Sequence, residues 1–291
     1  NRAIWRVLHR AFDWIELTDK VDIAYTPGWI GYLGYELGRH IERLPHTVTH
    51  DTPLPDLRLA FYDAVAVYDA IQQQWTIHRL QFDDPPPGAG DAANALRSLL
   101  AESPVDHAEP TTRRIDEADA APKPLINACS PFSPTEYEQA VATCVDYIAA
   151  GDIFQVNMSH RFKAEWAGNP AQLYCTLRRR NPAWYAAFLS FEADGQPCSI
   201  LSSSPELFLS VRNGRVVTRP IKGTRPRTGM ADVDARAASD LLSSGKDNAE
   251  LAMIIDLLRN DLGRVCLYNS VRVTDPCRLE THPTVFHLVG T

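Results

Sequence analysis

Apolar and polar residues follow regular intervals along most of the chain, and these intervals predict both strands and helices. Residues 61–68 and 74–78 are rich in aromatic and β-branched residues and flank a short polar segment, which is typical of a β-hairpin. Residues 184–218 contain further runs of this kind, separated by Asp194-Gly195 and Asn213-Gly214. Because Asn-Gly favours a two-residue type I′ turn, we expect a β-meander here.

The clearest helix signal lies between Ser133 and Gly151. Ser133, Pro134 and Glu136 have the spacing of a capping box with proline at the first helical position, and glycine is a common C-terminal cap. One apolar stripe of this helix should be buried: Tyr137, Val141, Val145 and Ile148. From Ile153 to Phe162 apolar and polar residues alternate, which predicts a strand with one polar face. That face is either exposed to water or lines a site.

Further helices are predicted at four places: residues 91–102, 169–177, 232–243 and 246–260. Residues 1–82 form a β-rich N-terminal region, and a Pro-, Ala- and acid-rich linker follows at 83–131. Strands and helices are mixed in residues 132–291, the expected catalytic region. This order of elements predicts an α+β fold, with antiparallel sheets flanked by helices.

Composition excludes several classes of protein. The 291 residues carry a net charge of −7, which argues against a dedicated nucleic-acid binder. No apolar run approaches the roughly 18 residues that a membrane span needs. The six cysteines include no C-x-x-C pair and the nine histidines no H-E-x-x-H, so a zinc site is not expected. Reduced thiols in a cytoplasmic protein are the simplest interpretation.

Lys222 lies in a strongly basic run, residues 219–227, directly after the Asn213-Gly214 hairpin. A lysine amine is nucleophilic only when neutral, and at its ordinary pKa roughly one molecule in 10³ is neutral at physiological pH, a handicap of about 4 kcal/mol. Neighbouring cations such as Arg219, Arg225 and Arg227 would lower that pKa. Taken alone, the run fits a solvated basic loop equally well.

Two carboxylates share a face of the helix predicted at 246–260. Asp247 and Glu250 recur at helical spacing with three core aliphatics: Leu251, Ile254 and Leu258. A buried carboxylate needs a partner. That partner is either an arginine such as Arg259 or Arg264, or Mg²⁺, which prefers one or two protein carboxylates together with substrate oxygens.

Glu206 and His287 are two more titratable candidates. Glu206 precedes a predicted strand and has the chemistry of a general acid or base, although a surface glutamate is the commoner interpretation. His287 lies among apolar residues, where a lone histidine is usually a satisfied core residue.

Together these residues belong to six motifs that occur in the order typical of chorismate-utilising enzymes, which the chain resembles from about residue 28 to 291. The motifs are Gly-Asp-Ile-Phe-Gln-Val-Asn (151–157), Ser-Pro-Glu (204–206), Pro-Ile-Lys-Gly-Thr (220–224), Lys-Asp-Asn-Ala-Glu (246–250), Asp-Leu-Leu-Arg-Asn-Asp-Leu-Gly-Arg (256–264) and His-Leu-Val (287–289). The resemblance implies that family's α/β sandwich. Anthranilate synthases in the family carry alanine where Lys222 stands, so the chain is more similar to the aminodeoxychorismate synthases.

The resemblance also implies roles for individual residues. The amine of Lys222 would attack chorismate, Glu206 would act as general acid and base, and His287 would lie beside the reacting ring. Gly223 and Thr224 would border the substrate. Glu250 would be a ligand of Mg²⁺, the one implied cofactor.

Ammonia would come from a glutamine amidotransferase subunit. A Gly-Ser-x-x-Gly-x-Pro-Lys segment and a second metal-binding glutamate, which the family has further along, do not occur in the 291 residues. We therefore expect the chain to be an internal piece of a longer protein.

Overall fold

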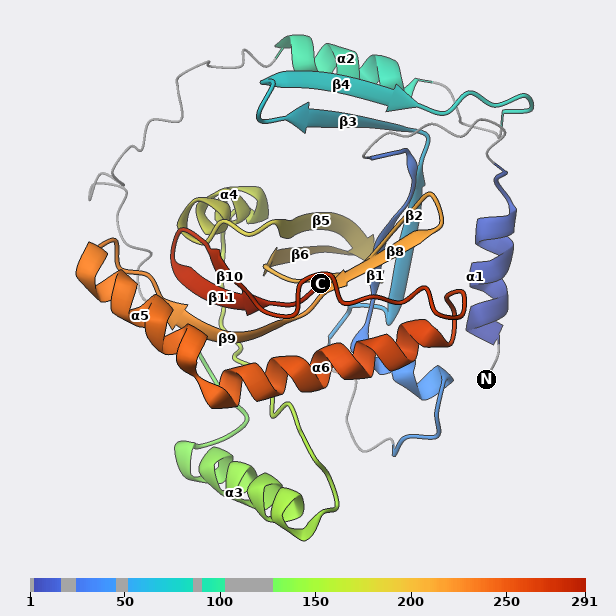
Figure 1. Ribbon diagram of the computed structural model, residues 1–291. Helices are drawn as coiled ribbons and strands as arrows, with labels where there is room; N and C mark the ends of the chain where they lie inside the picture. Colours follow the sequence, from blue (N-terminus) through green and yellow to red (C-terminus); the bar gives the residue numbers. More distant parts are fainter. Residues whose placement is uncertain (1–2, 17–24, 46–51, 86–90, 103–127) are drawn as a thin grey trace. The chain divides into compact units, whose positions relative to one another are not determined.

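The computed structural model describes residues 3–16, 25–45, 52–85, 91–102 and 128–291. Contacts divide the chain into a larger unit, residues 1–104 with 170–291, and a smaller unit, residues 105–169. Figure 1 shows the elements of both units. The division expected from the sequence, 1–82, 83–131 and 132–291, stays a prediction, and most of the expected linker lies outside the described residues.

The larger unit begins with one helix, a short 3₁₀ helix, two strand pairs and a second helix. Their bounds are α1 Ala3–Asp13, β1 Gly28–Leu33, η1 Tyr35–His40, β2 Leu57–Tyr62, β3 Ala64–Asp69, β4 Gln74–Arg79 and α2 Ala92–Glu102. β1 pairs with β2 and β3 with β4, both antiparallel. The hairpin expected from residues 61–68 and 74–78 is confirmed in β3–β4. The first run is nevertheless divided at Asp63, because Phe61 and Tyr62 end β2 instead.

The middle of the larger unit consists of α4 Pro170–Arg180 and two hairpins, β5 Tyr185–Ala193 with β6 Gln196–Ser204 and β7 Leu207–Arg212 with β8 Arg215–Arg219. Both predicted turns are confirmed. Asp194 and Gly195 have φ of 50° and 71°, and Asn213 and Gly214 have 49° and 73°. Positive φ at both central positions is the type I′ geometry, which matches the twist of the flanking strands. The four strands do not form one continuous meander, because β5 pairs with β6 and β7 with β8 in two separate sheets.

The C-terminal part joins a three-stranded antiparallel sheet to two helices. The elements are β9 Ile221–Pro226, α5 Ala231–Ser243, α6 Gly245–Gly263, β10 Arg278–Thr281 and β11 Val285–Val289, with strand order β10-β11-β9. α5 and α6 pack against β9 and β11, as Figure 1 shows in orange and red. Their shared core is fully or almost fully buried: Leu241, Leu251, Phe286 and Leu288.

The smaller unit contains α3, Pro134–Ala150. Its capping box is confirmed, since the backbone N–H of Glu136 donates to Ser133 Oγ at 3.2 Å and that of Ser133 donates to Glu136 Oε2 at 2.8 Å. Gly151 ends the helix with φ of 82°, as expected. The prediction of a buried stripe is wrong, because α3 has no buried residue.

The strand predicted at Ile153–Phe162 is wrong as well. Within the described residues this segment has no strand partner beyond an isolated bridge from Cys129 to Lys163, just after it. Alternation of side chains sets up two faces, but only a neighbouring strand can satisfy the backbone groups. Aromatic rings still gather at its end, where the His160 ring lies 4.3 Å from that of Phe162.

The α+β class is confirmed: every strand pair found in the described part of the chain is antiparallel, and helices pack on the pairs. None of the helices described is long and apolar enough to cross a membrane. The six cysteines all lie in the described part of the chain, and no disulfide joins any of them.

Candidate functional site

Lys222 lies on β9, the strand at one edge of the C-terminal sheet. In the pairing of β9 with β11, Thr224 lies opposite His287 and Lys222 opposite Leu288, so Gly223 is an extra, bulged residue. Its φ of +76° suits glycine. A Cβ there would also lie 2.8 Å from Leu241 Cδ1, on α5. The predicted lysine and threonine therefore flank a bulge that only glycine fits.

Glu206 reaches β9 from the residue just before β7. The backbone N–H of Ile221 donates to its Oε1 at 3.0 Å. This bond fixes the carboxylate beside the residue that precedes Lys222 and leaves its other oxygen for a second interaction. The structure thus places Glu206 next to the backbone that carries Lys222, 16 positions further along the sequence.

His287 lies on the central strand, β11, and is 8% exposed. Its Nδ1 lies 2.9 Å from the Thr224 hydroxyl, so the expectation of a satisfied buried histidine is confirmed. Burial lowers the pKa of His287, and the nearby His282 lowers it further, while the Gly223 backbone and two carboxylates, of Glu280 and Glu206, act in the opposite direction. The net direction favours a neutral imidazole.

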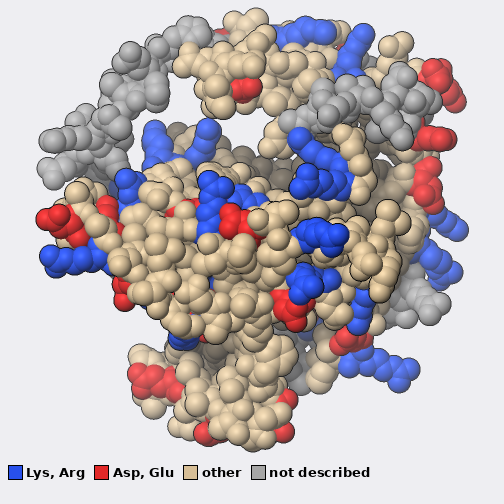
Figure 2. Space-filling model, viewed as in Figure 1, with Lys and Arg blue, Asp and Glu red and all other residues tan. Residues whose placement is uncertain are grey.

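The three arginines around Lys222 differ from expectation, because each has a carboxylate partner. The pairs are Arg219 with Glu280, Arg225 with both Asp240 (2.6 Å) and Asp247 (3.1 Å), and Arg227 with Asp234 (3.7 Å). Figure 2 likewise shows basic and acidic side chains next to one another on the face drawn. Since paired charges largely cancel at a distance, these arginines repel a charged lysine less than the sequence suggests.

The carboxylates of α6 have different environments. Asp247 pairs with Arg225, so the expected partners Arg259 and Arg264 are wrong; a hydrogen bond from Ser244, followed by the Arg225 interactions, lowers the pKa of Asp247. An arginine on the neighbouring strand β9 is closer to the buried side of α6 than one further along the same helix.

Glu250 lies one turn further along α6 and remains 42% exposed. It forms a long ion pair with Lys246, at 3.9 Å. Such a carboxylate, not committed to a tight ion pair, fits one ligand position of Mg²⁺, an ion that keeps several waters and substrate oxygens. No cluster of three or more metal-ligating side chains occurs among the residues described. Among the described residues no ion pair or hydrogen bond joins Glu250 to Lys222, Glu206 or His287.

A polar cluster next to His287 was not found from the sequence. Its buried members are Glu280 and His282, on the β10 side; the partly buried Arg219 and the exposed Trp184 lie against them. One sequence signal could have indicated it. Glu280 and His282 are two residues apart at a strand end, and residues at that spacing in a strand point to the same face.

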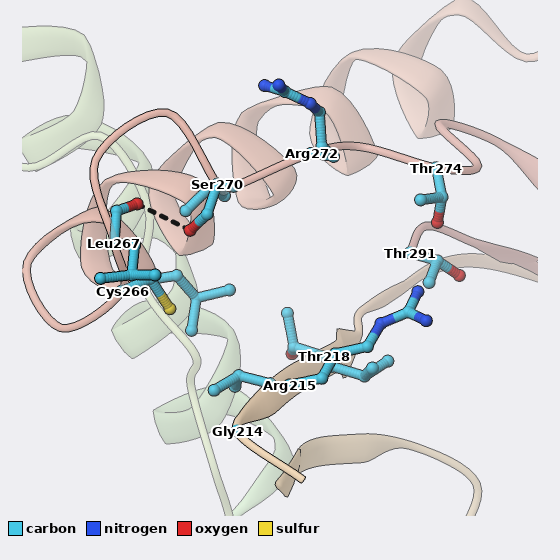
Figure 3. A pocket seen from close by; sticks show the side chains of 13 residues that line it. Gly214, Arg215, Thr218, Cys266, Leu267, Ser270, Arg272, Thr274 and Thr291 are labelled. Atoms are coloured by element: carbon cyan, nitrogen blue, oxygen red, sulfur yellow. Dashed lines mark hydrogen bonds between the residues drawn. The ribbon is translucent and has the colours of Figure 1, made fainter. Parts of the chain in front are cut away.

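A pocket of about 370 Å³ lies elsewhere in the larger unit (Figure 3). Residues 214–218 of the β7–β8 hairpin form one wall, and the chain after α6, with Thr291, forms the other. In Figure 3 the Arg215 side chain extends toward Thr291, and the Ser270 hydroxyl donates to the Leu267 carbonyl at 2.6 Å. None of the predicted site residues lines this pocket.

Comparison with known proteins gives one family. The model of the chorismate binding enzyme family matches residues 4–291. Aminodeoxychorismate synthase component 1 of Escherichia coli is 34% identical over 290 residues, which cover 100% of this chain and 58% of that protein. Anthranilate synthase component 1 of Thermus thermophilus is 38% identical over 268 residues, covering 91% and 54%.

A solved structure shares the fold. The crystal structure of anthranilate synthase component I from Streptococcus pneumoniae matches with a TM-score of 0.73 at 29% identity, covering 97% of this chain and 61% of that one. The chain spans a little over half the length of these relatives.

Proposed function

Because the chain belongs to the chorismate-binding enzyme family, we propose that the protein converts chorismate and ammonia to 4-amino-4-deoxychorismate, the amination step toward 4-aminobenzoate and folate. The observation that carries the proposal is Lys222 on β9, with the Glu206 carboxylate hydrogen-bonded to the adjacent backbone amide. Relatives named aminodeoxychorismate synthase component 1 in E. coli, Salmonella typhimurium and Bacillus subtilis, at 32–36% identity, support it.

The reaction proceeds by two substitutions. The neutral amine of Lys222 attacks C2 of the chorismate ring; the two ring double bonds shift, and the C4 hydroxyl leaves as water. Ammonia then attacks C4, the double bonds shift back, and the C2–N bond breaks to release the lysine amine. A covalent intermediate divides one difficult displacement into two easier steps.

Glu206 handles the proton. Its protonated carboxyl donates to the departing C4 hydroxyl, and the resulting carboxylate accepts a proton from the incoming ammonia. The hydrogen bond from Ile221 holds one oxygen in place, so the carboxyl does not need to be ordered when the substrate binds.

Binding of the dianionic substrate uses residues on the same strand. The Thr224 hydroxyl and the Gly223 backbone border the ring, and the neutral His287 imidazole lies beside it through its contact with Thr224. Glu250 would hold Mg²⁺, which when bound offsets the charge of a substrate carboxylate.

A second protein supplies the ammonia. The designation of the relatives as component 1 suggests a partner component. A glutamine amidotransferase has the required chemistry, since it releases ammonia from glutamine.

The alternative function is that of an anthranilate synthase component 1, which would release pyruvate. The identity of 38% to the T. thermophilus protein and the S. pneumoniae fold match support it. Lys222 favours amination, because direct attack of ammonia on chorismate needs no amine nucleophile in the protein.

Product analysis separates the two. The full-length protein is incubated with chorismate, Mg²⁺ and an ammonium salt, and the products are resolved by chromatography and mass spectrometry. We expect 4-amino-4-deoxychorismate and no pyruvate. Anthranilate with equimolar pyruvate would overturn the proposal.

The covalent step has its own readout. Acid-quenched protein should carry chorismate less one water on the peptide that contains Lys222. Lys222→Arg keeps the charge but is a poor nucleophile, so both adduct and amination should disappear. Lys246→Ala removes an exposed lysine on α6 and should retain the adduct. An adduct that persists in Lys222→Arg would show that another residue is the nucleophile.

A further inference from the structure

Glu280 and His282 lie in the buried cluster beside His287, and the proposed reaction uses neither of them. Their side chains are only 10% and 6% exposed. Register places Glu280 of β10 directly opposite His287 of β11. His282 follows β10 and donates its backbone N–H to the Val285 carbonyl at 2.9 Å, which holds it in the turn between β10 and β11.

The ring of His282 is enclosed on several sides. The Trp184 ring centroid lies 5.1 Å from that of His282. The Arg219 guanidinium lies over the Trp184 ring, 5.5 Å from its centroid. Arg219 also bonds Oε1 of Glu280. Arg227 donates to the His282 carbonyl at 3.3 Å. The imidazole is therefore confined by a carboxylate, an aromatic ring and its own anchored backbone.

Nε2 of His282 is the one buried side-chain nitrogen or oxygen atom without a hydrogen-bond partner in the described part of the chain. The closest carboxylate oxygen is Oε2 of Glu280, at 3.6 Å, just beyond hydrogen-bond length. Buried polar atoms are nearly always satisfied, so an exception at a candidate site calls for a role. A carboxylate oxygen accepts a hydrogen bond and an imidazole N–H donates one, so Oε2 of Glu280 and Nε2 of His282 could pair after a small shift.

His287 is the neighbour on which this pair acts. The two imidazole centroids are 5.2 Å apart with an interplanar angle of 64°. Two buried cations at that separation repel strongly. The oxygen of Glu280 that Arg219 does not bind faces the His282 ring, not the His287 ring. The charged or titratable side chains near His287 are those of Glu206, His282 and Glu280, the last with its partner Arg219.

We propose that His282, held against Glu280, is a positioning residue that orients the His287 imidazole toward Thr224 and keeps a second positive charge off it. His287 meets Thr224 on β9 through Nδ1, and its ring packs edge-to-face with that of His282. Only the consequence for turnover rests on the proposed function; the orientation of His287 is a property of the folded protein.

Nuclear magnetic resonance of ¹⁵N-histidine-labelled full-length protein measures this orientation without turnover. The His287 signals are assigned by their loss in His287→Gln. In His282→Phe, which keeps the ring contact but removes both nitrogens, the His287 protonation midpoint should rise by roughly half a pH unit, about a threefold gain in proton affinity. Burial still lowers the pKa of His287 in that variant, so the rise is partial.

A second variant separates orientation from charge. His282→Gln retains an N–H that can donate a hydrogen bond to Glu280, but it carries no charge. It should raise the midpoint in the same way while preserving the ¹⁵N shifts that report which His287 nitrogen bears the proton. If His282→Phe fails to fold, His282→Gln decides through the midpoint. An unchanged midpoint and unchanged ¹⁵N shifts of His287 would overturn the proposal.

A matched control and a kinetic measurement complete the test. His78→Phe, on the half-buried face of β4, should leave the His287 signals unchanged. With chorismate and ammonia, the acid limb of the kcat profile should move to higher pH in His282→Phe while KM stays within about twofold. A wild-type protein that does not aminate chorismate would refute the proposed function and leave the resonance result intact.

Discussion

The sheet β10-β11-β9 and the helix α3 are held by opposite kinds of interaction. The sheet joins Thr224 to His287, 63 positions apart, and packs Leu288 at 0% exposure against α5 and α6. α3 has no buried residue, and Val145 on its apolar stripe is 57% exposed. Long-range burial stabilises the first region, and local capping stabilises the second.

The difference concerns function as well as stability. Residues proposed for chemistry need positions fixed by several partners, and in the described part of the chain Lys222, Glu206 and His287 all lie on or against the packed sheet. The Ile153–Phe162 segment carries a family motif at its start, but none of its residues is buried and none belongs to a strand. A motif indicates chemistry, and burial supplies the geometry.

The largest effect is expected from Leu288→Ala. Leu288 is fully buried in the core cluster and lies opposite Lys222, so its truncation leaves a cavity behind the proposed nucleophile. We expect the free energy of unfolding to fall by about 2–5 kcal/mol, measured by urea denaturation.

Phe154→Ala is the matched change in the other region. Phe154 is 72% exposed, so its loss should alter stability by no more than about 0.5 kcal/mol. A loss similar to that of Leu288→Ala would show that the 153–162 segment is packed against a partner, and the contrast between the two regions would disappear.

Gly223→Ala tests how tightly the sheet holds the site. A Cβ at this position meets Leu241 Cδ1 at 2.8 Å and Asp247 Cβ at 3.0 Å, in a backbone with φ of +76°. We expect a loss of about 1–3 kcal/mol in unfolding free energy, together with reduced formation of the Lys222 adduct.

Gly195→Ala is its control. Gly195 has a similar φ of +71° in the β5–β6 turn, but an added Cβ meets nothing within 4 Å. The excess loss in Gly223→Ala therefore measures the steric contact with α5 and α6. Equal losses in the two variants would mean that only backbone strain matters and that the bulge tolerates a side chain.

Features encoded within a few residues were predictable from sequence. The two type I′ turns and the capping box at Ser133 form because Asn213-Gly214, Asp194-Gly195 and Ser133 with Glu136 satisfy their own backbone locally. The strand at 153–162 failed for the opposite reason: its alternation says nothing about whether another strand is available.

The site divides along the same line. Motifs nominate Lys222, Glu206 and His287 as site residues, and these roles stay predictions. The partners of the arginines were not predicted, because Arg225 pairs across to Asp247 on a helix 22 positions later. The cluster of Glu280, His282 and Trp184 was missed, since only β-pairing and side-chain packing bring it together.

The smallest effect is expected from Ser133→Ala, which removes the hydroxyl that caps α3. The Glu136 amide then loses its acceptor at 3.2 Å, at a cost of about 1 kcal/mol to the helix. Hydrogen exchange should show reduced protection in the first turn of α3, whereas Ser133→Asp, which keeps a capping oxygen, should retain it. Protection in β9 and β11 should stay unchanged, because α3 is stabilised locally and their core residues are not. Faster exchange in β11 would show that the helix supports the sheet, and the two regions would then be one cooperative unit.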